Sequence, residues 1–308
     1  MTPVSRRMML LDSASMYFRA FFGVPDSITA PDGTPVNAVR GFLDMIAFLV
    51  GGQHRPTHLI ACLDADWRPA WRVSAVPSYK AQRLAPGSNH IEVVPPALET
   101  QVPVIEAVLD ALGIARIGVA GYEADDVIGT LAAHATMPVD VVSGDRDLFQ
   151  VVDDDRSVRV LYIGRGVRKL EPMDDAAVRR KYGIPASGYA DFALLRGDPS
   201  DGLVGVAGIG EKTAASLIDG YGSVPGLLAA LDDPGSGLAP GLRMKLDAAR
   251  DYLVGAQPVV HVATDLKIPK HDATLPTDPA DPAALVALSE RWGLDGSLNR
   301  VLTALAAR

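Results

Sequence analysis

Nine carboxylates gathered in five short stretches carry the strongest chemical signal of this chain. They are Asp12, Asp64, Glu123, Asp125, Asp126, Asp145, Asp147, Asp198 and Asp201. So many negative groups cannot share one site without a counter-charge, and their hard oxygens are the ligands that Mg²⁺ and Mn²⁺ prefer. Any one of these Asp residues, taken alone, is explained as well by a helix cap or a turn. The grouping favours a divalent-metal site, provided that the fold brings the carboxylates together.

Three of these carboxylates follow short apolar runs that are typical of buried strands in a parallel α/β sheet. The runs and their carboxylates are 8–11 with Asp12, 59–63 with Asp64, and 139–142 with Asp145. In open sheets of this kind, ligands bind at the carboxyl ends of the strands. We therefore expect three strand ends, each with a carboxylate, to converge on one spot.

Composition is that of a globular protein with 48% hydrophobic and 21% charged residues, and the 308 residues suffice for one large and one small domain. No apolar stretch is long enough to span a bilayer. The single cysteine, Cys62, excludes an internal disulfide and fits a reducing cytoplasm. The formal net charge of −8 would become +1 without the nine carboxylates, so the acidity does not exclude a nucleic-acid partner bound by local basic groups.

The stretch 66–96 differs from the rest of the chain because basic and aromatic residues alternate in it between prolines. Its basic and aromatic members are Trp67, Arg68, Trp71, Arg72, Tyr79, Lys80, Arg83 and His90. Such a mixture suits phosphate contacts and base stacking in a mobile element over the site. An ordinary surface loop anchored by two Trp residues explains the same pattern.

Glu123, Asp125 and Asp126 stand at the start of a predicted helix that runs to about residue 135. Glu123 and Asp126 are one helical turn apart, whereas Asp125 points elsewhere in a regular helix. All three face one site only if the first turn is irregular, and Asp126 fits the set least well. An acidic first turn is also ordinary helix capping.

The second informative stretch, 195–215, combines Asp198-x-x-Asp201 with a Gly208-Ile209-Gly210 hairpin before a helix. The amides of such a hairpin can cradle a phosphate, to which Lys212 adds a positive charge. A P-loop is excluded, because Glu211 separates Gly210 from the lysine and no buried strand precedes the segment. A dinucleotide fingerprint is excluded because no third glycine falls at the right place.

With these motifs, the chain resembles the bacterial 5′ nuclease family, which comprises flap endonucleases and the 5′→3′ exonuclease domain of many bacterial DNA polymerases I. The matching stretches, in the order of the family, are 11–12, 17–19, 37–42, 64 with 71–72, 79–83, 121–127, 143–150 and 195–215. The resemblance implies a PIN-like, Rossmann-related α/β fold with a mostly parallel sheet flanked by helices, a helical arch, and a helix-three-turn-helix module. The domains expected are a nuclease core at 1–190 with its arch at about 66–95, a helix-three-turn-helix domain at 191–290, and a closing helix at 291–308.

The resemblance also implies roles for single residues. Asp12, Asp64, Glu123 and Asp125 would hold one metal ion, Asp145, Asp147, Asp198 and Asp201 a second, and Asp126 would act through water. The expected cofactors are two or three Mg²⁺ or Mn²⁺ ions, with K⁺ bound by the backbone of Val206 and Ile209. The residues expected to be catalytic are Lys80, Arg83, Asp125 and Asp145. The residues expected to contact DNA are Arg19, Arg72, Tyr79, Lys80, Arg83, Gly208, Gly210, Lys212 and Thr213.

The expected activity is metal-dependent hydrolysis of DNA phosphodiesters at 5′ ends, flaps and nicks, in replication and repair, by a monomer in the cytoplasm at the nucleoid. Two alternatives remain, a catalytically weak relative that binds branched DNA and a PIN-type ribonuclease. Gly202 stands where relatives usually carry Asn, which leaves the second metal in question. The closing helices at 285–308 favour a stand-alone nuclease over a domain excised from a polymerase.

Overall fold

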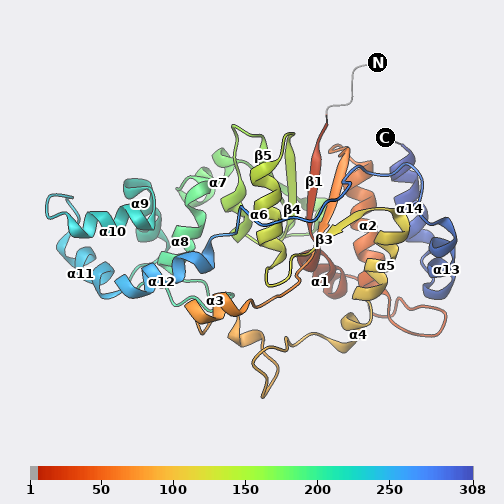
Figure 1. The fold of residues 1–308 in the computed structure, drawn as a ribbon, viewed down its shortest axis with the longest axis horizontal. Coiled ribbons are helices and arrows are strands. Elements are labelled where there is room, and N and C mark those ends of the chain that lie inside the picture. Colours follow the sequence, from red (N-terminus) through yellow and green to blue (C-terminus); the bar gives the residue numbers. More distant parts are fainter. Residues whose placement is uncertain (1–5, 308) are drawn as a thin grey trace.

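A six-stranded sheet with the strand order β3-β2-β1-β4-β5-β6 forms the centre of the computed structural model, which describes residues 6–307 (Figure 1). The strands are β1 (Met8–Asp12), β2 (His58–Cys62), β3 (Ala115–Ile117), β4 (Val139–Ser143), β5 (Val158–Tyr162) and β6 (Glu171–Met173). All neighbours are parallel except β5 and β6. The predicted α/β fold with a mostly parallel sheet is confirmed.

Strand register brings the three predicted strand ends to one edge of the sheet. Asp12 pairs with Cys62, and Leu11 pairs with Val142. Asp64 follows the end of β2 by two residues and therefore lies just beyond the level of Asp12. Asp145 follows the end of β4 by two residues at the same edge.

Alternate side chains of the strands enter two hydrophobic clusters on opposite faces of the sheet. Met9 and Leu11 pack in one cluster with α1 (Ser13–Gly23), α2 (Asn37–Gly51) and α5 (Val102–Leu112). Leu10 enters the other cluster, with α6 (Ala124–His134) and α7 (Asp175–Tyr182). This second cluster continues without interruption into a helical module.

The helical module lies beside the sheet, at the left of Figure 1. Its helices are α8 (Tyr189–Arg196), α9 (Glu211–Tyr221), α10 (Val224–Asp232), α11 (Pro240–Ala248) and α12 (Arg250–Val260). Leu217, Leu227 and Leu253 bury their side chains in the shared cluster. Within residues 6–307 no single helix is long and apolar enough to cross a membrane, although α9 and α10 reach that length together with a bend of 77°.

The chain returns from the module to the sheet domain after α12, which differs from the expected domain boundary at residue 290. Leu59 N donates to Ala273 O at 2.8 Å, so the returning segment lies along β2. Helices α13 (Pro282–Trp292) and α14 (Asp295–Ala306) then pack on α5 and α2. Helix α13 therefore belongs to the sheet domain, because its apolar side chains, such as Leu285, enter that domain's core.

The stretch expected to form a helical arch runs across the open side of the sheet's carboxyl edge and contains little helix. It holds α3 (Ala70–Ala75) and a single 3-10 turn (Ala81–Arg83), and leads into α4 (Pro96–Glu99). Prolines at five positions between 69 and 96 interrupt longer helices, since each removes a backbone donor.

Candidate active site

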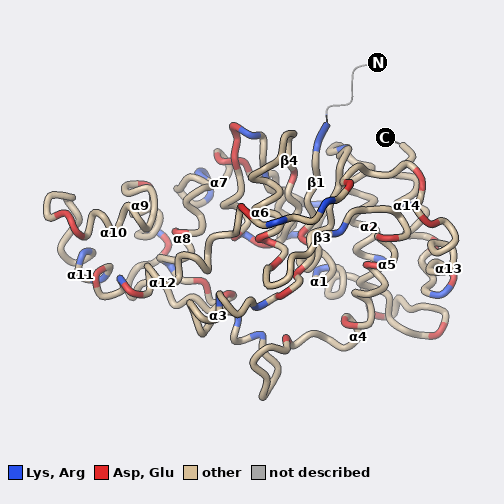
Figure 2. Tube along the Cα trace, in the orientation of Figure 1, with Lys and Arg blue, Asp and Glu red and all other residues tan. Residues whose placement is uncertain are grey.

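A cavity of about 1210 Å³ opens at the carboxyl ends of β1, β2 and β4. Five of the nine predicted carboxylates line it, namely Asp12, Asp64, Glu123, Asp125 and Asp145. Arg19, Lys80 and Arg83 line the same cavity. Figure 2 shows acidic segments at these strand ends and basic segments on the neighbouring stretch between α3 and α4. The sheet thus brings together the carboxylates that the sequence placed at strand ends.

Asp12 occupies the centre of this arrangement, because it ends β1 and caps α1. Its Oδ1 accepts a hydrogen bond from Ser15 N at 3.1 Å, and its Oδ2 accepts one from Ser143 Oγ at 2.5 Å. Burial raises the pKa of Asp12 to about 7 despite the Ser143 hydrogen bond, and the nearby charges of Asp64 and Asp145 add to the rise. Ser143 joins β1 to β4 at the site and was missed from the sequence, although it stands two residues before Asp145.

Asp64 and Asp125 are placed by the start of α6. Ala124 N donates to Asp64 Oδ1 at 2.7 Å. Burial raises the pKa of Asp64, and it raises that of Asp125, to which the neighbouring charges of Asp12 and Asp145 contribute. Asp125 lines the cavity together with Asp12, Asp64 and Asp145, so its carboxylate lies among the strand-end groups.

Asp145, Asp147, Asp198 and Asp201 form the second group. Asp147 N donates to Asp145 Oδ1 at 2.9 Å. Burial raises the pKa of Asp147, and Asp145, Asp201 and Asp198 raise it further by their charge. Burial also raises the pKa of Asp201, with Asp145 adding to the rise and Lys80 opposing it. Asp147 therefore lies close enough to the other three residues for their charges to affect it.

Neither group forms a ready-made cage of metal ligands. Within residues 6–307, no three Asp, Glu, His or Cys side chains stand in an arrangement that holds an ion as they lie. The protein's own donors occupy several of the oxygens instead. Asp198 accepts from Ser200 N at 3.0 Å and from Arg196 Nη2 at 3.1 Å. The donor set nevertheless fits a divalent cation. Carboxylates with raised pKa values require positive charge nearby to ionise together, and this group comprises Asp12, Asp64, Asp125, Asp147 and Asp201.

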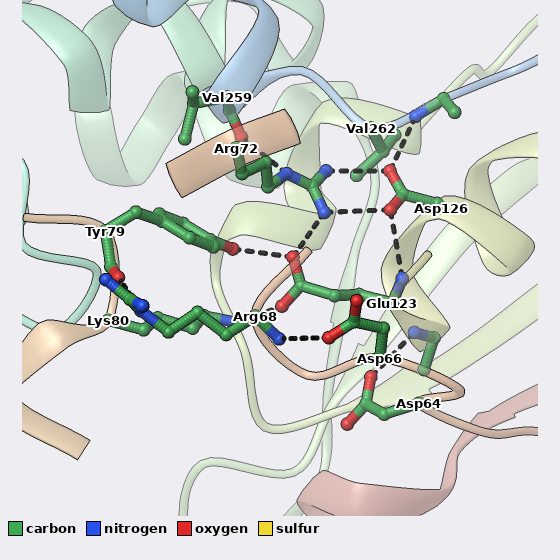
Figure 3. A network of polar contacts seen from close by, with 12 residues as sticks. Asp64, Asp66, Arg68, Arg72, Tyr79, Lys80, Glu123, Asp126, Val259 and Val262 are labelled. Carbon is green, nitrogen blue, oxygen red and sulfur yellow. Dashed lines mark hydrogen bonds and ion pairs between the residues drawn. The ribbon is translucent and has the colours of Figure 1, made fainter. Parts of the chain in front are cut away.

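Glu123 is surrounded by donors of the stretch 66–96 (Figure 3). Tyr79 Oη donates to Glu123 Oε2 at 2.7 Å, and Lys80 Nζ pairs with Oε1. Arg72 Nη1 also pairs with Oε2. Glu123 lies at the site, but three groups of the protein already hold its carboxylate.

Asp126 does not serve the site through water, in contrast to the expectation. Its side chain is fully buried, and it accepts from Arg72 Nη1 at 2.8 Å, Arg72 Nη2 at 2.7 Å, Glu123 N at 3.2 Å and Ala263 N at 2.9 Å. A carboxylate has about four acceptor positions, and all are used. Glu123 and Asp126 form a capping box at the start of α6, so the helix-capping interpretation is correct for Asp126.

Arg72 and Tyr79 are likewise placed differently from the DNA contacts expected of them. Each is only 3% exposed, and their polar groups point at Glu123, with those of Arg72 also at Asp126. Neither can reach a phosphate while these bonds persist. These contacts could not be predicted from the sequence, because Arg72 and Asp126 are 54 residues apart.

Lys80 and Arg83 lie at the cavity, beside the loop of Asp198 and Asp201. Lys80 N donates to Asp201 O at 3.1 Å, and Arg83 Nη2 lies 3.3 Å from Asp201 Oδ1. Ser78 Oγ donates to Gly202 O at 2.8 Å. These bonds form what we call the 78–83/200–202 contact. A Cβ added at Gly202 would lie 2.0 Å from Ser78 O, and φ at Gly202 is +72°, so only glycine permits this close approach.

Arg19 lies on the β4–β5 side of the cavity. Its Nη1 donates to Gly164 O at 3.1 Å and its Nη2 to Gly144 O at 3.3 Å. Arg146 and Arg165 line the cavity beside it and were not singled out from the sequence. Arg146 could have been found from the sequence, because it separates Asp145 from Asp147.

The Gly208-Ile209-Gly210 hairpin lies in the helical module and does not line the cavity. Gly208 has φ of +72°, and Ile209 N donates to Val206 O at 2.9 Å, which closes the turn. Gly210 precedes α9, whose first turn carries Lys212 and Thr213. Lys245 Nζ, from α11, donates to Gly208 O at 3.0 Å. The hairpin thus presents a helix amino end and exposed lysines at a distance from the carboxylates.

Comparison with known proteins finds two matching family models and full-length relatives. The 5'-3' exonuclease N-terminal resolvase-like domain matches residues 7–183, and the 5'-3' exonuclease C-terminal SAM fold matches residues 184–283. A 5'-3' exonuclease of Streptomyces coelicolor is 63% identical over 302 residues, covering 97% of this chain and 100% of that protein. A 5'-3' exonuclease of Mycobacterium tuberculosis is 52% identical over 310 residues, covering 97% of each.

Among solved structures, the bacteriophage T5 D15 flap endonuclease in a pseudo-enzyme-product complex with DNA and metal ions has a similar fold. Its TM-score is 0.63 at 18% identity, covering 97% of this chain and 99% of that one.

Proposed function

Because the chain belongs to the 5'-3' exonuclease family, we propose that it hydrolyses DNA phosphodiesters at 5′ ends and 5′-flap junctions, with the help of bound divalent metal ions. The observation that supports this most is the convergence of Asp12, Asp64, Glu123, Asp125 and Asp145 on one cavity, where the pKa values of Asp12, Asp64 and Asp125 are raised. Such a group is costly unless cations accompany it.

The carboxylates are proposed to divide between two Mg²⁺ or Mn²⁺ ions. Asp12, Asp64, Glu123 and Asp125 would hold one, and Asp145, Asp147, Asp198 and Asp201 the other. Bound ions of this kind polarise a phosphodiester and lower the pKa of a bound water. Asp125 and Asp145 are central to the proposal because both line the cavity, and the charge of Asp145 raises the pKa values of Asp12, Asp125 and Asp147.

Lys80 and Arg83 are proposed to orient the scissile phosphate. Both side chains line the cavity, where Lys80 pairs with Glu123 and Arg83 with Asp201. A phosphate bound in the cavity would therefore lie near both cations. Their positive charges would compensate the phosphate where the carboxylates repel it. Lys80 would have to exchange Glu123 for the phosphate when substrate binds.

The hairpin is proposed to grip the duplex backbone through its amides and through Lys212, away from the cut. A K⁺ ion on the carbonyls of Val206 and Ile209 is part of this proposal. Lys245 Nζ on Gly208 O supports it, because it places a cation against the hairpin's carbonyls. We propose further that the chain acts as a monomer at the nucleoid.

Cleavage of a 5′-labelled DNA flap in Mg²⁺, Mn²⁺ or EDTA tests the proposal. Cleavage should require metal and should disappear in Asp125→Ala and Asp145→Ala, while duplex binding in Ca²⁺ survives in both. Tight binding of the flap without cleavage by the parent would instead identify a branched-DNA-binding relative. Preferential cleavage of a matched RNA would identify a ribonuclease. Near-normal turnover of either variant at saturating Mn²⁺ would refute the assignment of the two residues.

A further inference from the structure

Arg72 is a buried cation whose donors all face acceptors at the back of the site (Figure 3). Its Nε donates to Val259 O at 3.1 Å, and its Nη1 and Nη2 form a two-pronged pair with Asp126 at 2.8 and 2.7 Å. Nη1 also pairs with Glu123. One guanidinium therefore joins a cavity carboxylate, a helix cap and the end of α12.

Such an arrangement depends on Arg rather than on positive charge alone. The planar fork binds Asp126 with two parallel bonds and leaves Nε for a third partner, which a lysine ammonium cannot reproduce. The three side chains are at most 3% exposed, so removing the guanidinium would leave Asp126 buried without an ion-pair partner. Glu123 would then be held by Tyr79 and Lys80 alone, both from the Pro-rich stretch 66–96.

The network also fastens the junction through which the helical module returns to the sheet domain. Arg72 binds Val259 O, and Asp126 binds Ala263 N. Gln150 completes the attachment, because its side chain accepts from Val262 N at 3.0 Å and donates to Asp147 O at 2.8 Å. Residues 259–263 are therefore hydrogen-bonded to groups that adjoin both carboxylate clusters.

We propose that Arg72 is a positioning residue, which orients Glu123 toward the metal site and fixes that orientation relative to the end of α12. The proposal rests on the proposed function, since Glu123 is taken as a metal ligand. Arg72 itself does not line the cavity. Its replacement should weaken metal binding and slow the chemical step, whereas contacts of the hairpin with duplex DNA should persist.

The test compares Arg72→Met and Arg72→Lys with Arg116→Met as the matched control. Arg116 also bridges two carboxylates, Asp110 and Glu106, but on an exposed edge away from the cavity. Three quantities are measured: Mn²⁺ affinity without DNA by electron paramagnetic resonance, kcat and KM on a flap, and the duplex dissociation constant in Ca²⁺.

Partners that orient a ligand typically change metal affinity by about 10–100-fold, and we expect a loss of that size in Arg72→Met. The loss should appear in kcat rather than KM. Arg72→Lys should lose part of the affinity, and Arg116→Met none. All variants should bind duplex as the parent does.

Parent-like Mn²⁺ affinity and kcat in a folded Arg72→Met would overturn the proposal. If that variant does not fold, Arg72→Lys decides, and parent-like values there would overturn it equally. An equal loss in Arg116→Met would do so as well, because the effect would then reflect general destabilisation. A parent that neither binds Mn²⁺ nor cleaves would refute the proposed function instead.

Discussion

Replacing Gly202 by alanine should detach segment 78–83 from the 200–202 loop. The new Cβ would meet Ser78 O at 2.0 Å, so the backbones must separate. Separation breaks the bonds from Lys80 N to Asp201 O and from Ser78 Oγ to Gly202 O. At about 0.5–1.5 kcal/mol each, their loss lowers the free energy of unfolding by roughly 1–3 kcal/mol.

Left-handed backbone adds a separate penalty, which a control variant can isolate. Gly237 has φ of +71°, almost that of Gly202, but no atom lies within 4 Å of a Cβ built there. Gly237→Ala should therefore pay only the conformational cost of roughly 1–2 kcal/mol. The difference between the two variants measures the contact itself.

Thermal unfolding and amide hydrogen exchange provide the assay. A difference of roughly 1–3 kcal/mol corresponds to about 2–12 °C in unfolding temperature, at about 2–4 °C per kcal/mol for domains of 150–250 residues. Exchange should accelerate at 78–83 in Gly202→Ala and not in Gly237→Ala. Equal unfolding temperatures together with unchanged exchange at 78–83 would refute the reasoning.

Four further outcomes are expected. Lys80→Ala and Arg83→Ala should each raise the activation free energy of the single-turnover reaction by roughly 2.7–4 kcal/mol and leave the duplex affinity unchanged. Parent-like rates with weaker binding would contradict this. Burial raises the pKa of Asp12 from 3.8 to about 7, so between these pH values the folded metal-free protein binds a proton that the unfolded chain releases. The unfolding temperature in EDTA should therefore fall as the pH rises from about 4 to about 7. The fall should be smaller in Asp12→Asn. Lys212→Ala should flatten the slope of log duplex affinity against log salt by about 0.9. Exchanging K⁺ for Li⁺ should weaken duplex binding, more strongly in Lys245→Ala; unchanged affinity in both would exclude a K⁺ role.

The strand ends could be predicted from the sequence because strands that are buried on both faces consist of continuous apolar residues. Residues 8–11 and 139–142 are such runs, and the polar residue after each marks the edge of the sheet. The convergence of Asp12, Asp64 and Asp145 followed from that pattern and from the rule for parallel sheets. Local sequence was sufficient there because β2, β1 and β4 are parallel neighbours in the sheet, so their carboxyl ends lie at one edge.

The partners of Arg72 and Asp126 could not be predicted, because nothing local distinguishes a buried pair from a site residue. The sequence around Asp126 fits a helix cap and a metal ligand equally well, and only the hydrogen bonds from Arg72 distinguish the two roles. The return of α13 to the sheet domain was missed for a similar reason. An amphipathic helix such as α13 shows an apolar face, with Leu285 on it, without indicating which core it covers.

The return of the chain after α12 makes the helical module an insertion within the sheet domain rather than an appendage. It is tethered at two points, before α8 and at residues 259–263, and its apolar core is continuous with the sheet's. A domain connected to the rest of the protein at two points has less rotational freedom than one on a single linker, and it therefore loses less entropy when it binds DNA. Duplex seated on the hairpin would meet carboxylates at a preset distance. The fold would then act as a ruler, setting how many base pairs separate the gripped backbone from the cut.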